Sequence, residues 1–537
     1  MTEAPNPTSY DELPYDSHPY DRTHPDHLAT MARLFGIAAP DTNSCRVLEL
    51  GCAAGGNLIP MAASMPNATF LGIDLSARQI DEGGRNIQKV GLRNIELRQQ
   101  SIADLTGSDG LFDYVICHGV YSWVPPDIQD AILRVCSGNL STNGVAYISY
   151  NTYPGWFMRG MVRQMMCFHA RQFKDAATQV EQARALLDFL IEAGPGNDPT
   201  YHQLLKRELE IVRNRADSYL FHEHLEAHNE PLFFHQFAEK AADHNLRYLS
   251  ETQLSEMIPS NYAPNVEETL QRLGSSLIHV EQYLDFLRNR TFRRTLLCHA
   301  DLEPNRELGE AQLAHMHVAS TLQPVSHEPN LALHVEETFR GAGGMTASVS
   351  HPILKSALVA LYKASPAALP FDKLPTIANK EQGVTSGAGE FMVRDADNFA
   401  EDRRNLGQLI LELYTRDLVE LRAMPQRFTL KVSDLPWVNP LVRQQADEAA
   451  WATNLRHEIL SLNDLDRHLL RCLDGTNTLS DIVATFSELV KGGQLVVEHD
   501  GQDSSQIANN LKLLETLVSH GLSRLARHAF LQHQPST

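Results

Sequence analysis

Short apolar runs alternate with longer, more polar stretches over the first 150 residues of the chain. The apolar runs have the length of β-strands and lie at residues 45–50, 69–74, 94–99, 112–118 and 145–151. The stretch after the second run begins at Ser76, which can cap a helix, and ends at Gly91. Apolar strands joined by crossover helices are typical of a parallel sheet with helices on both faces. The pattern therefore predicts a doubly wound α/β domain.

Helical spacing dominates the next segment, residues 157–229. Apolar side chains there recur three and four positions apart, as at Leu186 and Leu190. Two further strand-like runs follow at 246–249 and 292–298. We expect a helical insertion followed by strands that complete the same sheet, so that the α/β domain ends near residue 300.

The chain beyond residue 300 contains a weak internal repeat. One set consists of residues 353–362, 371–374 and 405–421, and the other of residues 465–473, 479–482 and 510–525. Each set has the order helix, helix, long helix and short strand, which is the order of a winged-helix unit. Such units usually bind DNA through a basic helix, but these third helices carry few cations, with Arg416 in one and Lys512 and Arg524 in the other. We therefore expect two mostly helical, winged-helix-like domains that contact protein.

The patterns divide the chain into five segments. They are an N-terminal aromatic arm at 1–44, a Rossmann-like core at 45–156, a helical insertion with further sheet elements at 157–300, a middle domain at 301–430 and a C-terminal domain at 431–537. A chain of 537 residues has room for several cores, because one domain takes roughly 150 residues. We expect residues 380–400 and the tail after Phe530 to be flexible.

Composition narrows the range of partners. The chain has 46 Lys and Arg against 66 Asp and Glu, a formal net charge of −20, which repels phosphate backbones and disfavours nucleic acid. Its seven cysteines are scattered and form no C-x-x-C pair, which argues against disulfides and zinc and for a reducing compartment. The start has no leader pattern, and no apolar run reaches the roughly 18 residues of a membrane span. We expect a cytoplasmic protein without a membrane span.

A glycine-rich turn follows the first predicted strand. It contains Gly51, Ala53 and Gly55, with Glu49 two residues before the first glycine, and Asp74 ends the second strand. A strand, a glycine turn, a helix and a second strand ending on a carboxylate hold an adenosine-containing ligand in doubly wound domains. The alternatives are a tight strand–helix turn without a ligand and, for Asp74, a cap for the next helix.

The spacing of this turn resembles motif I of the class I methyltransferases, which use S-adenosylmethionine (SAM). The resemblance implies that the turn holds the amino-acid end of SAM with Glu49 near the amine, that Asp74 accepts from the ribose hydroxyls, and that Asp104 accepts from the adenine amino group. The alternative for Asp104 is a helix N-cap. The expected cofactor-binding residues are Glu49, Gly51, Cys52, Ala53, Gly55, Asn57, Asp74, Leu75, Ala103, Asp104 and His118.

Aromatic and polar side chains gather after the fourth and fifth strands, at the edge of the sheet where ligands bind. Methyl transfer is an in-line displacement that needs alignment and a neutral nucleophile. Aromatic walls would hold a lysine ammonium by cation–π contact while desolvation lowers its pKa; the alternative for each ring is core packing. His118 either borders the cofactor as a base or is only a hydrogen-bonded structural residue. The expected catalytic residues are His118, Tyr121, Trp123 and Asn151, and the remaining rings of the cluster are Tyr150, Tyr153 and Trp156.

Three further clusters carry weaker signals. The aromatic arm around Tyr10–Tyr15 and Tyr20 is either a lid over the cofactor or a structural strap. The histidine-rich run 222–228 suggests a metal, but alternate residues on a helix diverge, so we expect no metal site. The arginines within 288–294 favour a solvated or ion-paired face over an anion site.

Several motifs resemble one bacterial family. They are Tyr10–Tyr15, Leu48–Asn57, His118–Val124, His222–Glu226, Gln282–Phe286 and Phe292–His299. The family consists of methyltransferases that bear a methyltransferase regulatory domain and includes rickettsial protein-lysine methyltransferases of outer-membrane protein. The resemblance implies a SAM-dependent enzyme that acts on protein lysine, a regulatory region at about 215–300, and a C-terminal half that helps to bind the protein substrate.

Two other functions remain open from the residues alone. One is methylation of a small molecule, and the other is a SAM-sensing domain that regulates a partner. More than 200 residues follow position 300, which exceeds what a small substrate needs, and the intact Glu49, Gly51 and Asp74 disfavour a pure sensor. We expect SAM as cofactor, a protein substrate and no nucleic acid, with a homodimer as an open alternative.

Overall fold

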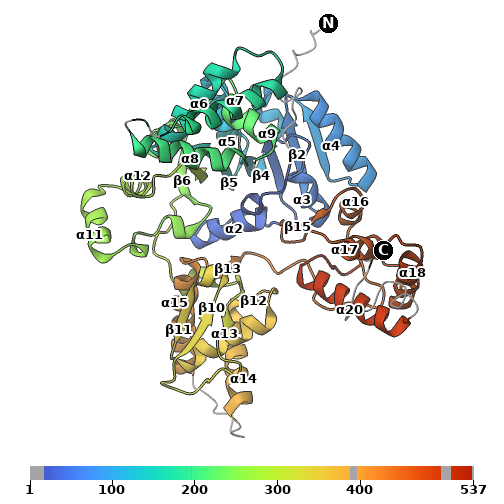
Figure 1. Cartoon of the computed structure of the whole chain (residues 1–537). Coiled ribbons are helices and arrows are strands. Elements are labelled where there is room, and N and C mark those ends of the chain that lie inside the picture. The colour runs from blue at the N-terminus through green and yellow to red at the C-terminus, as the bar shows by residue number, and fades with distance from the viewer. Residues whose placement is uncertain are drawn as a thin grey trace.

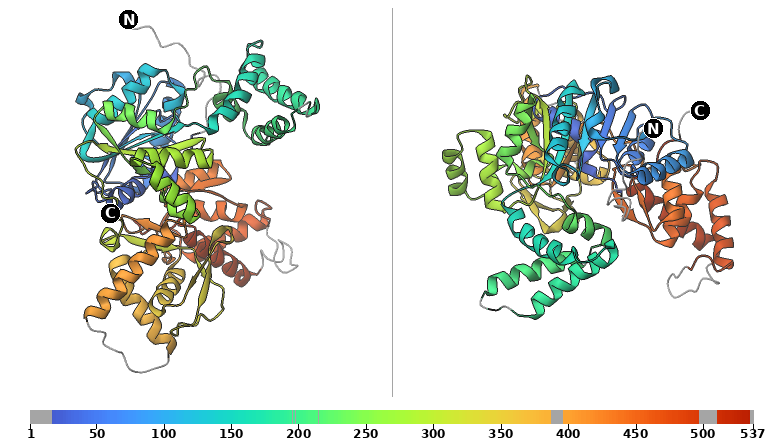
Figure 2. Two further views of the ribbon diagram at one scale, coloured as in Figure 1. Left: turned by 90° about the vertical axis from the view of Figure 1, so that its left-hand side faces the viewer. Right: turned by 90° about the horizontal axis from the view of Figure 1, so that it is seen from above.

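The structure of the chain is a computed structural model that describes residues 17–194, 196, 198–213, 215–386, 396–496 and 510–534. Figure 1 shows an α/β domain above, a middle domain below it and a C-terminal domain against its lower edge. In the turned views of Figure 2, a helical segment stands off from the α/β domain. The motif Tyr10–Tyr15 lies outside the described residues, so neither interpretation of that arm is tested.

A seven-stranded sheet forms the centre of the α/β domain. Its strands are β1 (Arg46–Leu50), β2 (Thr69–Asp74), β3 (Ile95–Gln99), β4 (Phe112–Cys117), β5 (Leu140–Asn151), β6 (Leu246–Glu251) and β7 (Phe292–His299). They lie in the order β3-β2-β1-β4-β5-β7-β6, with β1 to β5 parallel and β7 antiparallel to both neighbours. The predicted doubly wound sheet is confirmed, although β5 begins at Leu140 and not at residue 145.

The order of the strands reverses between β1 and β4. Ligands of open α/β sheets bind in the crevice outside the carboxyl ends of the strands at such a switch point. Glu49 lies next to this point, in register with Gly72 of β2 on one side and Ile116 of β4 on the other. The topology therefore selects the carboxyl ends of β1, β2 and β4 as the place to look for a site.

Helices cover both faces of the sheet. They are α2 (Pro25–Leu34), α3 (Leu58–Ser64), α4 (Ala77–Val90), α5 (Pro126–Gly138), α10 (Phe234–Asp243) and α12 (Leu277–Arg288). Helix α11 (Pro264–Leu273) packs against α12. Val47 and Ile116 pack with residues of α2 and α3, whereas Leu48 and Val115 pack with residues of α5. Successive side chains of a strand point to opposite faces, so the continuous apolar runs reflect burial of both faces.

Helix α2 is an element that the sequence analysis did not predict. The ring nitrogen of His24 accepts a hydrogen bond from the backbone of Asp26, and Pro25 occupies the first helical position, where its missing N–H costs nothing. Leu28, Met31 and their neighbours on α2 are fully buried. The arm is therefore part of the core from Pro25 onward.

The predicted helical insertion is present between β5 and β6. It consists of α6 (Gly155–Ala170), α7 (Ala176–Glu192), α8 (Pro199–Arg213), α9 (Asp217–Leu220) and a π-helical turn at Phe221–Leu225. These helices enclose a core of their own, which includes Val162, Leu187, Leu209 and Val212. The insertion is the segment that stands off from the sheet in Figure 2.

A buried ion-pair cluster joins β6, β7 and α12. The guanidinium of Arg293 is fully buried and contacts Glu251 at 2.7 Å, Asp285 at 2.8 Å and Glu281 at 3.2 Å. A charge without partners at this depth would be strongly destabilising, so the cluster requires all of these elements together. The ion-paired interpretation of the arginines at 288–294 is confirmed for Arg293, and the pairing is buried and not solvated.

The middle domain combines two small sheets with three helices. Its strands are β8 (His317–Ser320), β9 (Gln323–Pro324), β10 (Glu337–Arg340), β11 (Thr346–Val349), β12 (Leu369–Pro370) and β13 (Val419–Arg422), and its helices are α13 (Pro352–Ala364), α14 (Leu374–Ser386) and α15 (Ala396–Tyr414). The predicted order of three helices and a strand is present in α13, α14, α15 and β13. Part of the segment 380–400 lies outside the described residues.

In its described residues, the C-terminal domain begins with a helix and a short hairpin and continues with three helices. These elements are α16 (Pro440–Glu448), β14 (Trp451–Thr453), β15 (Ile459–Ser461), α17 (Asp464–Cys472), α18 (Leu479–Lys491) and α20 (Leu511–Arg527). Helix α16 lies against α3 and α4 of the α/β domain (Figure 1), and Lys89 of α4 forms an ion pair with Glu448. The C-terminal domain is thus docked beside the glycine-rich turn. Among the described residues, no helix is both long and apolar enough to cross a membrane.

Candidate active site

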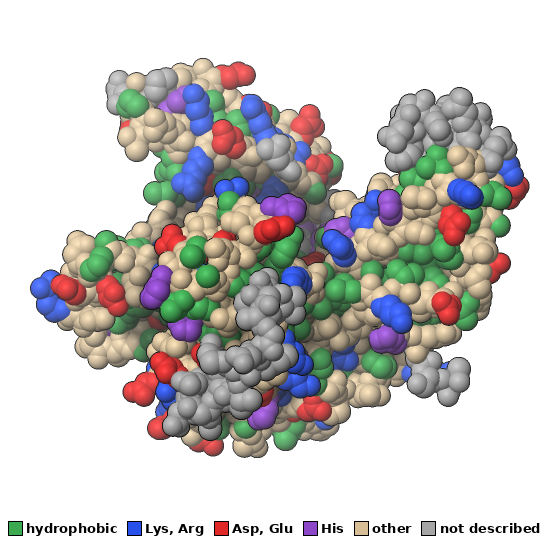
Figure 3. All heavy atoms as spheres, turned by 90° about the horizontal axis from the view of Figure 1, so that it is seen from below, with side chains coloured by type: hydrophobic (Ala, Val, Ile, Leu, Met, Phe, Trp, Pro, Cys, Tyr) green, Lys and Arg blue, Asp and Glu red, His purple; other side chains and the backbone are tan. Residues whose placement is uncertain are grey.

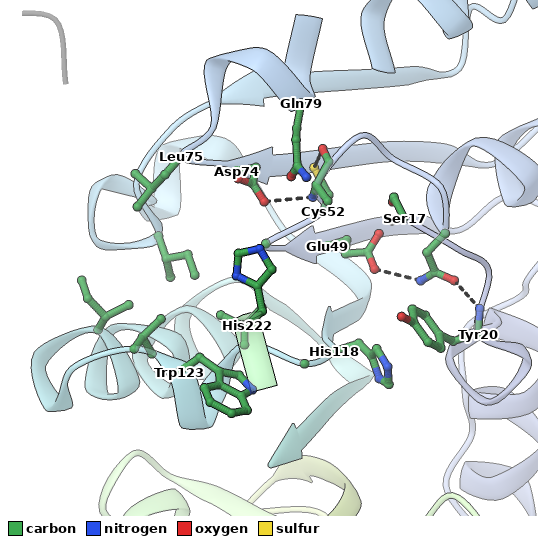
Figure 4. A pocket seen from close by; sticks show the side chains of 18 of the residues that line it. Ser17, Tyr20, Glu49, Cys52, Asp74, Leu75, Gln79, His118, Trp123 and His222 are labelled. Carbon is green, nitrogen blue, oxygen red and sulfur yellow. Dashed lines mark hydrogen bonds between the residues drawn. The ribbon is translucent and has the colours of Figure 1, made fainter. Parts of the chain in front are cut away.

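A cavity of about 650 Å³ lies at the carboxyl ends of β1 to β5. Each of these five strands, or the loop after it, contributes to the wall: Glu49 and Gly51, Asp74 and Leu75, Gln100 and Ser101, His118 and Gly119, and Asn151. Figure 4 shows Glu49, Asp74 and His118 around this cavity, together with Ser17 and Tyr20 of the N-terminal segment and His222 of the insertion. The cavity has the size of a small-molecule site.

The glycine-rich turn takes its shape from three positive backbone angles, at Gly51, Ala53 and Gly55. Gly51 has φ +73°, and a Cβ there would lie 2.5 Å from Val120 Cγ2, so glycine is required on both counts. Ala53 has φ +49°, an unusual angle for a residue with a Cβ. Its backbone nitrogen donates to Asp74 Oδ2 at 2.9 Å, which ties the turn to the end of β2.

Glu49 is a buried acid with one committed oxygen. Its Oε1 accepts from Asn57 Nδ2 at 2.8 Å, whereas its Oε2 is buried and has no hydrogen-bond partner within the described part of the chain. Burial raises the pKa of Glu49 to about 8, against the opposing effect of the Asn57 hydrogen bond. Glu49 lines the cavity, and a buried carboxylate oxygen without a partner suits a cationic donor such as a ligand amine.

Asp74, at the end of β2, accepts hydrogen bonds from the backbone of the glycine-rich turn and from the backbone at the start of α4. Its Oδ2 accepts from Ala53 and its Oδ1 accepts from the backbone nitrogen of Ser76 at 2.9 Å. Helix α4 is capped by Ser76 itself, whose hydroxyl accepts from Gln79. Asp74 is therefore not the cap of α4. A carboxylate has acceptor capacity beyond two backbone donors, and Asp74 lines the cavity, so its role toward a ligand stays a prediction.

The wall after β3 differs from the prediction. Gln100, Ser101 and Ile102 line the cavity, whereas Ala103 and Asp104 are exposed and do not. Ile102–Asp104 form a single 3₁₀ turn capped by Ser101. This turn directs Ile102 inward and the acid outward, so the structure does not place Asp104 at an adenine site. Gly55 also lies outside the wall, where it shapes the turn with φ +75°.

His118 borders the cavity but is held as a neutral ring. Its Nδ1 is 2.7 Å from the hydroxyl of Tyr147, and its ring lies 3.8 Å, centroid to centroid, from that of Tyr20. Burial, with a smaller effect of Arg294, lowers the pKa of His118 to about 3. A group with this pKa is a weak proton acceptor near neutrality, so the geometry favours a wall over a general base.

The expected aromatic cluster is mostly core. Tyr121 is fully buried, with its ring 5.3 Å from that of Phe237, and Tyr150 stacks on the same ring at 4.1 Å. Tyr153 and Trp156 also lie outside the cavity wall, and Trp123 alone of the five rings lines it. The other rings of the wall are Tyr20, Tyr219 and Phe292. The sequence near the strand ends could not show which rings lie in the core and which line the cavity, because tertiary contacts decide this.

The insertion supplies one wall that the sequence analysis missed. Arg159, Tyr219, His222 and Glu223 face the cavity, and His222 Nδ1 is 3.2 Å from Glu226 Oε1. Burial raises the pKa of Glu223 to about 7. Among the described residues, no group of three or more His, Cys, Asp and Glu side chains is arranged for a metal ion. The histidine-rich motif drew attention to this segment of the sequence. Which of its side chains line the cavity, however, depends on the π-helical turn at Phe221–Leu225.

Residues 17–20 form a strap over the glycine-rich turn. The backbone nitrogen of Gly56 donates to Ser17 Oγ at 2.7 Å, and the backbone nitrogen of Tyr20 donates to Asn57 Oδ1 at 3.0 Å. Figure 4 shows Tyr20 beside Glu49 and His118. This segment both ties down the turn and lines the cavity, so the choice between a lid and a structural strap stays open.

Family comparisons agree with the strand order and the turn. The methyltransferase domain model matches residues 41–196, the predicted methyltransferase regulatory domain matches residues 216–299, and the C-terminal winged-helix domain of PKMT matches residues 434–530. The sheet, the turn and these matches define a SAM-dependent methyltransferase. The matched regulatory region coincides with the expected one.

Two relatives cover nearly the whole chain. An uncharacterized protein of Rickettsia prowazekii is 37% identical over 529 residues, which is 97% of this chain and 93% of that protein. The structure of PKMT2 from Rickettsia typhi in complex with AdoHcy has a TM-score of 0.83 and 29% identity, covering 96% of this chain and 100% of that one. The chain belongs to the family of methyltransferases that carry the regulatory domain and the PKMT winged-helix domain.

Proposed function

We propose that this enzyme transfers methyl groups from SAM to the Nζ of lysine side chains in a protein. The observation that carries the proposal is the likeness to PKMT2 along 96% of the chain, including the winged-helix domain named for PKMT. A small-molecule acceptor would leave the middle and C-terminal domains without a role. The proposal concerns the acceptor, a lysine side chain in a protein. That the enzyme is a SAM-dependent methyltransferase follows from the family comparisons.

The cavity offers a partner for each part of SAM. We place its amine at Glu49 Oε2, the one buried oxygen of that acid without a partner in the described structure. Its ribose would lie at Asp74 and its adenine near Ser101 and Ile102. PKMT2 binds AdoHcy, the product form of this cofactor. When bound, SAM supplies a methyl group on a sulfonium, and the residues of this chain align it.

The acceptor side of the cavity is the wall from the insertion. A lysine ammonium must lose a proton before it can attack, since its ordinary pKa is about 10.4. Glu223, with its pKa raised to about 7 by burial, is suited to hold the ammonium and to receive that proton near neutral pH. Trp123 lines the same cavity and offers a ring face for cation–π contact. Among the predicted catalytic residues, Trp123 and Asn151 stay in this proposal as wall residues.

The surface suits a protein better than a polyanion. Figure 3 shows one face that is hollowed between two lobes and that mixes acidic with basic side chains, without a broad basic area. The net charge of −20 points the same way. We also propose a cytoplasmic location, where the seven free cysteines would stay reduced.

The test is a labelling experiment with the purified full-length protein. It is incubated with methyl-labelled SAM and a bacterial extract, which is then separated into protein and small-molecule fractions. We expect label in protein that peptide mass spectrometry locates on lysine, and no label with the Asp74→Ala variant. Label confined to the small-molecule fraction would reject the lysine assignment while leaving the methyltransferase class intact.

A further inference from the structure

The hairpin β14–β15 of the C-terminal domain reaches the cofactor end of the cavity. Its tip carries His457, which is buried. This residue contacts Asn57 of the glycine-rich turn, which lies 400 residues earlier in the sequence. We propose that His457 is a positioning residue for the cofactor site: through Asn57 it fixes the orientation of Glu49, so that SAM affinity depends on the docked C-terminal domain. This inference rests on the proposed role of Glu49 in binding the SAM amine.

Two short hydrogen bonds connect the hairpin to the acid. His457 Nε2 is 2.8 Å from Asn57 Oδ1, and Asn57 Nδ2 donates to Glu49 Oε1 at 2.8 Å. All three side chains are at least 95% buried. Water cannot readily replace either bond at this depth, so the loss of one partner leaves an unsatisfied polar group next to the site.

The direction of both bonds follows from chemistry. The backbone N–H of Tyr20 can only donate, so the Asn57 atom that it contacts is Oδ1, which also faces His457, and Asn57 Nδ2 faces Glu49. A carbonyl oxygen only accepts, so His457 carries its proton on Nε2. Burial also keeps the ring neutral by lowering the pKa of His457 to about 3. The relay thus has one orientation, which occupies Glu49 Oε1 and leaves Oε2 without a partner in the described structure.

The backbone of the hairpin tip is held in an unusual conformation that aims the ring. His457 has φ +65°, in the left-handed region that side chains other than glycine rarely occupy. Asn454 maintains this turn, since its Oδ1 accepts from the backbone nitrogens of Arg456 and Glu458 at 2.9 and 3.0 Å. Such strain persists where the surroundings enforce it, and it is concentrated at functional sites.

The strap lies between the hairpin and the turn. The backbone nitrogen of Tyr20 donates to Asn57 Oδ1 at 3.0 Å, so strap and hairpin converge on a single amide oxygen. The rings of His18 and Trp451 meet edge to face at 5.8 Å, and those of His24 and His457 lie 5.4 Å apart. Movement of the C-terminal domain would therefore disturb the strap and Glu49 together.

The experiment compares variants of the full-length protein at position 457. His457→Ala removes the donor, whereas His457→Gln retains an amide N–H near the position of Nε2; both share the cost of the left-handed backbone. We expect His457→Ala to raise the Kd of SAM about tenfold by calorimetry, the effect of one buried hydrogen bond, with kcat at saturating SAM changed less than about twofold. His457→Gln should recover most of the affinity. His520→Ala, an exposed histidine of the same domain, is the matched control.

A double-mutant cycle with Asn57→Ala separates positioning from general stability. If the relay exists, His457→Ala should have almost no further effect on the Kd of SAM in the Asn57→Ala background. Additive effects, or an unchanged Kd in His457→Ala, would overturn the proposal. If His457→Ala does not fold, His457→Gln decides alone: a folded Gln variant whose Kd has risen as much as tenfold also overturns it. Unchanged SAM affinity in Glu49→Gln would instead reject the proposed role of Glu49.

Discussion

Gly56 lies directly beneath Ser17. The backbone nitrogen of Gly56 donates to Ser17 Oγ at 2.7 Å, and a Cβ on Gly56 would lie 2.1 Å from the carbonyl oxygen of Ser17. Backbone atoms cannot yield as a flexible side chain can. A residue in the arm before the first helix and a residue in the glycine-rich turn are therefore fitted to each other.

This contact predicts the effect of a single methyl group. Gly56→Ala should displace the strap, because its backbone has no room for the added carbon, and the cavity should open on that side. We expect SAM affinity to fall about tenfold or more by calorimetry, as for the loss of a buried hydrogen bond plus a steric clash. The control is Gly84→Ala in α4, where a Cβ meets nothing within 4 Å. Equal affinities in the two variants would contradict the fitted strap.

Asp74 predicts a second effect on the cofactor. Its carboxylate holds the turn through Ala53 and faces the cavity, so Asp74→Ala should remove both the backbone acceptor and the proposed ribose partner. Two charge-assisted hydrogen bonds correspond to a loss of about 100-fold in SAM affinity. Asp81→Ala, an exposed acid on the next helix, should leave it unchanged. An unaltered Kd for Asp74→Ala would exclude the ribose assignment.

Glu49 predicts a pH dependence. Its pKa of about 8 means that the empty site holds a proton below that pH, whereas a bound amine favours the ionised form. Binding then releases the proton, so the affinity for SAM should rise with pH up to about 8, by up to about tenfold per unit, and then level off. Calorimetry in buffers of different ionisation enthalpy measures the proton released. Glu49→Gln should bind weakly and without this dependence; a dependence that survives the substitution belongs to another group.

The elements that follow from local pattern were predictable from the sequence. The strand-forming runs, the turn at Gly51 and the insertion depend on short-range periodicity and on glycine at a positive φ, which leave a direct trace in the residues. The order of the helices in the C-terminal domain also left such a trace, whereas the regulatory region was expected only from the family resemblance. These parts of the fold agree with the structure and with the family matches.

Features that depend on tertiary contacts were not predictable. Tyr121 and Trp123 are two residues apart, yet one packs against Phe237 from α10 and the other lines the cavity. Asp104 turns away because a single 3₁₀ turn sets its direction. The contact of His457 with Asn57 spans 400 residues, and no local pattern encodes such a pairing. The sequence therefore predicted the fold and the cofactor site better than it predicted the residues of the acceptor wall.

The acceptor wall leads to the last prediction, which concerns Glu223. If this residue receives the lysine proton, Glu223→Gln should lower kcat by about 100-fold, the usual contribution of a positioned base, while the Kd of SAM stays unchanged. The pH profile of kcat in the native enzyme should rise through about 7, the pKa that burial gives Glu223, and the variant should lose that limb. Glu181→Gln, an exposed glutamate of the same insertion, is the control for the substitution itself. A variant that keeps its kcat, or that loses activity only through weaker SAM binding, would assign the proton to another acceptor and would leave the cofactor site as described.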